Sequence, residues 1–151
     1  GMDKPAQNSD GGINDIIRKW SGDHQGYPFA IAFNNESAPV GFQRTFLAAR
    51  YNGHTCYNAP TDTSPQVSYS TFHHVVLTKQ STTLRLYVNN VLVKTFMDTT
   101  TESTYCSTTN NSHMTIGTRG QLARFFTGKI DDIRIYSRAL SSSEIANLFG
   151  E

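Results

Sequence analysis

The chain has 151 residues, of which 37% are hydrophobic and 17% are charged, and its 13 Lys and Arg residues nearly balance 12 Asp and Glu residues. This length suits a single domain, and the formal charge of +1 excludes the broad positive field that general nucleic-acid binding requires. The longest apolar run, residues 28–33, is far shorter than the roughly 20 residues of a membrane span, so we expect no membrane insertion.

Residues 1–12 are polar and glycine-rich and show no apolar period, which predicts a loop or tail ahead of a domain formed by residues 13–151. This segment also lacks a basic start followed by an apolar centre, so the chain shows no signal peptide. The frequent Ser, Thr and Asn residues beyond it suit strands and turns, and they indicate an all-β domain of the extracytoplasmic kind.

Alternation of apolar and polar residues predicts many short strands. In residues 27–34, three large apolar residues share one face, whereas Ala30 and Ala32 share the other. Two small residues on one face indicate that another part of the chain packs closely against it. The predicted strands are residues 15–20, 27–34, 42–51, 72–79, 83–88, 91–97, 114–117 and 128–136.

The order of these strands predicts the fold class. Asn89 and Asn90 lie between two strands and predict a tight hairpin, because Asn tolerates the left-handed backbone conformation. The sequence shows no alternation of strands with helices, which excludes a parallel α/β sheet. Many short strands separated by turn residues favour a sandwich.

A single helix is predicted over residues 142–149. Ser141 followed three residues later by Glu144 is a capping box, in which each side chain binds the other residue's free backbone N–H. Gly150 supplies the end of the helix. We expect this helix to close one end of the sandwich. The residues that it can bury are Ile145, Leu148 and Phe149.

The C-terminal part of the sequence carries a family likeness. Residues 127–141, which read TGKIDDIRIYSRALS, resemble the C-terminal signature of laminin-G-like domains of the concanavalin A-like lectin/glucanase superfamily. Three further segments resemble strands of the same family, namely residues 13–33, 72–78 and 86–90. The resemblance covers nearly the whole chain from Lys4, and it implies an antiparallel β-sandwich of the jelly-roll type with one short C-terminal helix.

The family includes both enzymes and binding modules, and the acidic residues distinguish the two. A glucanase needs two carboxylates that flank the glycosidic bond. The four Glu residues are Glu36, Glu102, Glu144 and Glu151. We expect none of them to pair with another on a strand, and the adjacent Asp131 and Asp132 point to opposite faces of a strand. We therefore expect no enzyme, and glycoside hydrolysis is the least favoured alternative.

The resemblance also implies a structural calcium ion with Asp131 as a ligand, since an Asp at this point of the last strand helps to hold calcium in related domains. The alternative is that Asp131 and Asp132 bind backbone amides or pair with Arg134 or Arg138. No other cofactor is expected.

Carbohydrate binding needs an aromatic platform and planar polar side chains that match pairs of hydroxyl groups. Residues of both kinds lie in the predicted loops and at strand ends. The candidates are Trp20, His24, Tyr27, Arg50, Tyr51, His54, Tyr57, Arg119 and Arg124. For each aromatic residue the alternative is packing in the core or at a sheet edge.

These observations predict a non-catalytic, lectin-like or adhesion module that binds a glycan or polysaccharide. The alternative is a protein–protein interaction domain of a larger extracellular protein. Arg119 and Arg124 would favour anionic glycans, whereas a flat apolar patch would favour a protein partner. The resemblance further implies an extracytoplasmic location, whether secreted, periplasmic or on the cell surface.

The resemblance also predicts self-association. Only Lys4-Pro5 remain of a pattern that ends an earlier strand in the family. Without that strand, a neighbouring strand would keep unpaired N–H and C=O groups. The apolar face formed by Phe29, Ile31 and Phe33 would also stay exposed to solvent. Such an edge pairs readily with another chain. We therefore expect a homodimer, formed by edge-to-edge pairing or by exchange of residues 1–12.

Cys56 and Cys106 are the two cysteines of the chain, and an oxidising compartment would allow a disulfide between the long loops that carry them. Closing this loop would stabilise the fold by about 4 kcal/mol in the chain-entropy model. Two unrelated buried thiols are the alternative.

The disulfide leads to a first prediction. Thiol titration of the unreduced protein in denaturant should find no free thiol, and a sample reduced beforehand, which should give two, is the control. Two free thiols without reduction would refute the disulfide and weaken the extracytoplasmic assignment.

Overall fold

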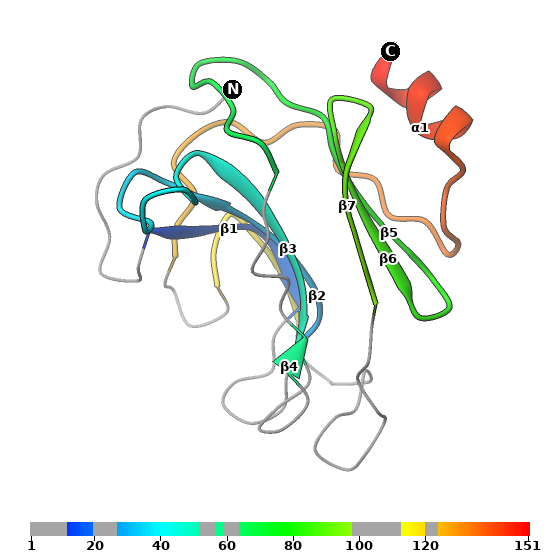
Figure 1. The fold of residues 1–151 in the computed structure, drawn as a ribbon, viewed down its shortest axis with the longest axis horizontal. Coiled ribbons are helices and arrows are strands. Elements are labelled where there is room, and N and C mark those ends of the chain that lie inside the picture. Colours follow the sequence, from blue (N-terminus) through cyan, green and yellow to red (C-terminus); the bar gives the residue numbers. More distant parts are fainter. Residues whose placement is uncertain (1–11, 20–26, 52–56, 59–63, 98–112, 120–123) are drawn as a thin grey trace.

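The computed structural model describes residues 12–19, 27–51, 57–58, 64–97, 113–119 and 124–151. These residues form two antiparallel β-sheets and a single short helix near the C-terminus (Figure 1). The arrangement confirms the expected all-β sandwich.

The five-stranded sheet has the order β4-β3-β2-β1-β8. Its strands are β1 (Ile13–Lys19), β2 (Tyr27–Asn34), β3 (Thr45–Tyr51), β4 (Tyr57–Asn58) and β8 (Met114–Ile116). The three-stranded sheet has the order β5-β6-β7. Its strands are β5 (Val75–Gln80), β6 (Thr83–Val88) and β7 (Val91–Met97). Each strand pairs antiparallel with its neighbours.

The core lies between the facing sides of the two sheets, which we call the inner faces. Phe33 on β2 and Phe46 on β3 are Cα partners, and their rings meet edge to face with centroids 5.4 Å apart. Val88 of β6 completes this buried cluster from the other sheet. The expectation that Phe33 stays exposed to solvent is therefore wrong, because the three-stranded sheet covers it.

The opposite side of the five-stranded sheet, which we call the outer face, carries small residues at its centre. Ala30 and Ala32 are each only 1% exposed, so the predicted close packing on this side of β2 is confirmed. Their Cα partners on β1 are Arg18 and Asp15. The alanines leave space for these two larger polar side chains.

The hairpin between β6 and β7 forms as predicted. Asn89 and Asn90 both have positive φ, at 50° and 63°, and Val88 pairs with Val91 across the turn. Two consecutive left-handed residues match the right-handed twist of the flanking strands, which is why Asn is favoured here.

Two strands begin later than predicted. Residues 42–44 form a turn, in which the N–H of Phe42 donates to the carbonyl of Pro39 and Arg44 has a φ of 56°, so β3 begins at Thr45. Residues 72–74 are not part of β5, which begins at Val75. The two-residue strand β4 was not predicted, because it lies in a segment whose prolines indicated irregular structure.

The prediction of a strand over residues 128–136 is wrong. Asp132 has a φ of 50°, which interrupts the extended backbone. Its N–H donates to Oδ1 of Asp131 at 2.9 Å, and its carboxylate accepts from Nε of Arg134 at 2.9 Å. These local contacts hold a bend where the sequence pattern indicated regular alternation.

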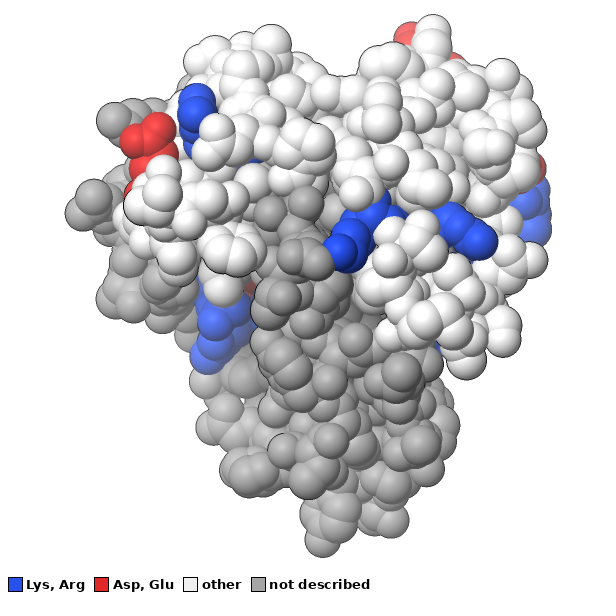
Figure 2. Space-filling model, viewed as in Figure 1, with Lys and Arg blue, Asp and Glu red and all other residues white. Residues whose placement is uncertain are grey.

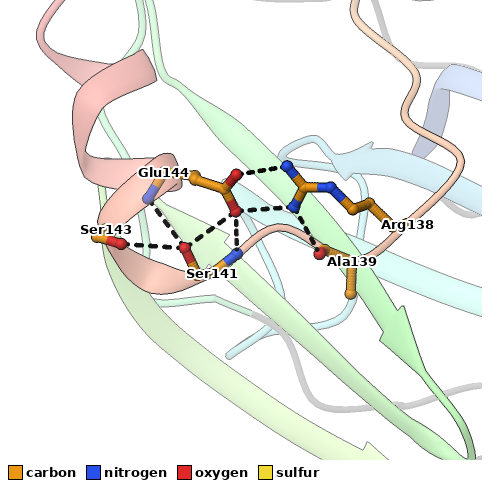
Figure 3. A network of polar contacts seen from close by, with 5 residues as sticks. All are labelled: Arg138, Ala139, Ser141, Ser143 and Glu144. Atoms are coloured by element: carbon orange, nitrogen blue, oxygen red, sulfur yellow. Dashed lines mark hydrogen bonds and ion pairs between the residues drawn. The ribbon is translucent and has the colours of Figure 1, made fainter.

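Helix α1 (Ser142–Phe149) has the predicted bounds and cap. The N–H of Glu144 donates to Oγ of Ser141 at 3.3 Å, and the N–H of Ser141 donates to the Glu144 carboxylate at 2.8 Å (Figure 3). Arg138 adds a bidentate ion pair to the same carboxylate. Ile145 is fully buried as predicted, whereas Phe149 stays exposed. The helix therefore packs against the sandwich mainly through Ile145 and not through its whole apolar side.

The described surface fits the balanced composition. Figure 2 shows the described Lys and Arg residues of the face in view in small separate groups. Among the described residues, no helix is both long and apolar enough to span a membrane.

The cap of α1 generates a pH prediction. Hydrogen bonds from Arg138 and Ser141 lower the pKa of Glu144 from its ordinary 4.5 to about 2. The ionised carboxylate therefore stabilises the folded state above pH 4.5, and this contribution is lost as the pH falls towards 2. Glu144→Gln should lower the thermal unfolding temperature at pH 7, and the difference from the wild type should vanish near pH 2.

Glu36→Gln removes the same charge from an exposed loop and serves as the control for this experiment. A constant difference between Glu144→Gln and the wild type across the pH range would contradict the assigned role.

Candidate functional site

Three candidate residues lie in one row across the five-stranded sheet. Tyr27 and Tyr51 are Cα partners on β2 and β3, and Tyr51 and Tyr57 are partners on β3 and β4. Partners in antiparallel strands belong to the same face of a sheet. The three tyrosines therefore occupy one row of the backbone register across β2, β3 and β4, which we call the tyrosine row.

A β-bulge in β1 places two charged residues on the same outer face. The register with β2 shifts between Asp15 and Ile17, which leaves Ile16 as the extra residue. In a regular strand, residues three apart point to opposite faces, but the extra residue brings Asp15 and Arg18 to one side. Nη2 of Arg18 donates to Oδ1 of Asp15 at 2.9 Å, and both side chains are almost fully buried.

The chain that follows β8 turns back over β1 and brings two more arginines to this ion pair. The N–H of Gly117, which has a φ of 73°, donates to the carbonyl of Ile16 at 2.8 Å. The N–H of Asp15 donates to the carbonyl of Arg124 at 2.9 Å. Arg119 and Arg124 are half-buried, and their charges act on the Asp15 carboxylate. We call Arg18, Arg119 and Arg124 the arginine cluster.

The electrostatics of Asp15 reflect two opposed effects. Burial is the larger one and raises the pKa of its carboxyl, whereas the positive charges of the arginine cluster lower it. Oδ1 accepts the hydrogen bond from Arg18, but Oδ2 is buried without a hydrogen-bond partner. In the described part of this face, three guanidinium groups therefore surround one carboxylate that retains an unused acceptor.

The structure brings some of the predicted site residues together and separates others. The register joins Tyr27, Tyr51 and Tyr57 in one row of the five-stranded sheet, and Arg119 and Arg124 belong to the arginine cluster. Arg50 precedes Tyr51 on β3 and is the Cα partner of Asn58 on β4, so it lies in the neighbouring row of the register. Trp20, His24 and His54 lie outside the described residues, as do Cys56 and Cys106.

Sequence reasoning missed Asp15 and Arg18. Their spacing places them on opposite faces of a regular strand, and only the bulge at Ile16 brings them together. The available signal was weak, namely two opposite charges beside the adjacent Ile16 and Ile17, where a buried ion pair is the favourable way to hold them.

The calcium prediction at Asp131 has no support from the described geometry. Oδ1 of Asp131 accepts from the backbone of Asp132, and Asp132 pairs with Arg134, which is the alternative left open above. In the described ranges no group of three or more His, Cys, Asp or Glu side chains could hold a metal ion. Calcium takes six to eight oxygen ligands. These residues as they lie do not fit a calcium site, and the ion stays a prediction.

An apolar cavity of about 690 Å³ lies on the inner side of the sandwich. It separates Phe29 and Ile31 of β2 from β5 and from residues 129–138. His74 lies at its border with its ring 5.9 Å from that of Phe149. Burial, helped by the charge of Arg134, lowers the pKa of the His74 imidazole below its ordinary value, so burial favours its neutral form.

Comparison with known proteins identifies the fold. The laminin-G-like family model described as the concanavalin A-like lectin/glucanases superfamily matches residues 4–146. The chain belongs to this superfamily. The resemblance derived from the sequence signature is thereby confirmed, and the two antiparallel sheets agree with it.

Other comparisons add little. No curated protein matches the chain significantly. A solved structure of an S-layer domain-containing protein from Clostridium thermocellum is similar at 23% sequence identity, with a TM-score of 0.45. That match covers 99% of this chain and 68% of the other.

The buried ion pair generates a stability prediction. Arg18→Met leaves the Asp15 carboxylate buried without its hydrogen-bonded partner, so it should lower the free energy of unfolding by about 3–5 kcal/mol in urea titrations at pH 7. The double variant Asp15→Asn/Arg18→Met removes the unpaired charge and should recover most of this loss.

Arg44→Met is the control, since the Arg44 hydrogen bond to Gln66 is exposed and its removal should cost less than about 1 kcal/mol. Equal costs for Arg18→Met and Arg44→Met would mean that the Asp15–Arg18 pair contributes no more than a surface contact.

Proposed function

We propose that this protein is a non-catalytic module that binds carbohydrate on the outer face of its five-stranded sheet. The observation that carries the proposal is that the arginine cluster lies on this face of the sheet whose strands hold the tyrosine row in register. Membership in a superfamily of lectins and glucanases supports the choice of carbohydrate as the ligand.

The two groups of residues supply complementary chemistry. Tyrosine rings can stack on the apolar faces of sugar rings, while their hydroxyl groups reach polar substituents. Guanidinium groups bind carboxylates or sulfates in a bidentate manner. Arg119 and Arg124 are half-buried beside β1, and we propose that their guanidinium groups contact the ligand, so that the preferred glycan is anionic.

Binding without cleavage is proposed because four of the six described carboxylates serve structural contacts. Asp15 is buried against Arg18, Glu144 caps α1, and Asp132 and Glu151 both bind Arg134. Glycoside hydrolysis needs two carboxylates placed on either side of the scissile bond, about 5–10 Å apart. None of these four is available for that role while its contact is kept.

We further propose an extracytoplasmic location, which the laminin-G-like family supports. The second candidate function is that of a protein-binding domain. It is favoured by the exposed apolar residues of the C-terminal segment. Those residues are Ile133, Ile135 and Tyr136.

Affinity electrophoresis with polygalacturonate and with a neutral β-glucan tests the proposal. The wild type should be retarded by polygalacturonate, and increasing salt should weaken the retardation because the contacts are ionic. Arg119→Ala and Arg124→Ala should each weaken binding about tenfold, the worth of one charge-assisted hydrogen bond. Arg85→Ala, on β6 of the other sheet, should bind like the wild type.

Retardation by the neutral glucan alone would reject the anionic preference, and absence of binding across a broad glycan array would reject the carbohydrate function. Release of reducing sugar from any of these polysaccharides would overturn the non-catalytic assignment.

A further inference from the structure

Residues 64–74, which we call the strap, lead from the five-stranded sheet to β5 of the three-stranded sheet (Figure 1). The beginning of the strap is fixed beside the start of β3. The N–H of Ser64 donates to the carbonyl of Phe46 at 3.1 Å, and the N–H of Val67 donates to the carbonyl of Arg44 at 2.8 Å. The strap therefore follows one sheet before it crosses to the other.

The strap covers part of the buried cluster of Phe33, Phe46 and Val88. The ring of Tyr69 meets that of Phe33 edge to face with centroids 6.1 Å apart. The ring of His73 meets that of Phe46 in the same way at 5.9 Å. Release of the strap would therefore expose part of the cluster to solvent.

The end of the strap is fastened to the β6–β7 turn through Asn89. The N–H of Asn89 donates to the carbonyl of His74 at 2.8 Å, and the N–H of His74 donates to Oδ1 of Asn89 at 3.1 Å. Because Oδ1 accepts this bond, the side-chain amide directs its Nδ2 to Nδ1 of His73, at 3.1 Å.

This orientation of Asn89 decides which form of the His73 ring fits. An amide nitrogen only donates, so Nδ1 of His73 accepts and carries no proton. The proton of the neutral ring then lies on Nε2, which donates to the carbonyl of Ser68 at 3.0 Å. The neutral ring thus satisfies both contacts.

A protonated His73 ring cannot keep all of these contacts. An imidazolium carries N–H groups on both nitrogens, so its Nδ1–H would face the donor group of Asn89. Turning the amide of Asn89 over would supply an acceptor, but it would set Nδ2 against the N–H of His74. Uptake of a proton therefore costs one hydrogen bond in either orientation of the amide.

The ring of His73 contacts residues that do not titrate, namely Phe46, Ser68, Thr71 and Asn89. Other titratable groups lie on the strap or act on it. They are Tyr69 and His74 on the strap, Glu36 and Arg44, whose charges act on Tyr69, and Asp132 and Arg134, whose charges act on His74. A test of His73 has to separate it from His74, the second histidine of the strap.

We propose that His73 is an acid-sensitive latch, which fastens the strap to the β6–β7 turn while its ring is neutral and releases the strap when the ring takes up a proton. Histidine is the side chain that ordinarily changes charge between pH 5 and 8, so the latch holds at pH 8 and opens as the pH falls towards 5. The proposal rests on the contacts of the strap and not on carbohydrate binding. It is also independent of the expected self-association through residues 1–12, of which residues 1–11 lie outside the described ranges.

Asn89→Asp gives the sharpest test, because a carboxylate accepts from both the N–H of His74 and the Nδ1–H of a protonated His73. Asp, like Asn, tolerates the left-handed backbone of this position. The measurement is the hydrogen-exchange protection of the amides of residues 74 and 89, relative to their intrinsic rates at each pH. In the wild type, protection should fall about tenfold from pH 8 to pH 5, the equivalent of one hydrogen bond. In Asn89→Asp, protection should be kept at pH 5.

Two further variants serve as controls. Asn90→Asp adds the same charge at the next residue of the turn, which is exposed and also has a positive φ, and it should respond to pH like the wild type. His74→Gln removes the other histidine and should keep the response. Equal responses of the wild type and Asn89→Asp would overturn the latch, as would a response that is lost in His74→Gln.

Nitrogen NMR of the wild-type imidazole rings covers the case in which a variant fails to fold. At pH 8 the His73 ring should carry its proton on Nε2, and its protonation at lower pH should coincide with the loss of protection of the amides of residues 74 and 89. A proton on Nδ1 at pH 8, or protection that persists after the His73 ring is protonated, would overturn the proposal.

Discussion

The single extra residue in β1 determines what each face of the five-stranded sheet carries. Because Ile16 has no partner on β2, Asp15 and Arg18 both belong to the outer face, and Ile16 and Ile17 both border the inner side. Without the bulge, one of the two charges would lie among Phe33 and its neighbours, where its desolvation would have no compensating partner. The bulge therefore separates an apolar core from a charged face within one short strand.

The parts of the fold that follow from local chemistry could be predicted from the sequence. The bounds of β2 follow from strict alternation, the β6–β7 turn from the backbone freedom of Asn, and α1 from the reciprocal contacts of Ser141 and Glu144. In each case the decisive interactions lie within a few residues of one another. Distant parts of the chain do not change them.

The parts that depend on distant contacts could not be predicted. The bulge is visible only once β1 is paired with β2, and β3 begins late because Arg44 is left-handed and the carbonyl of Arg44 binds the N–H of Val67. Residues 128–136 alternate as a strand does, but alternation does not supply the neighbour that a strand needs.

The candidate site shows the same division. Tyrosines and arginines are recognisable as sugar-binding residue types, but only the register collects Tyr27, Tyr51 and Tyr57 in one row. The place of Arg119 and Arg124 depends on how the chain after β8 returns to β1, a contact between residues about a hundred positions apart in the sequence.

The tight packing at Ala30 and Ala32 bears on how such a domain can diversify. A side chain larger than alanine at either position would collide with the residues packed around it or displace the Asp15–Arg18 pair, since both alanines are almost fully buried. The centre of the outer face is thus closed to variation one residue at a time. New ligand preferences within this architecture would have to arise at its margins, where strand ends and loops can change length and composition without disturbing the sheet.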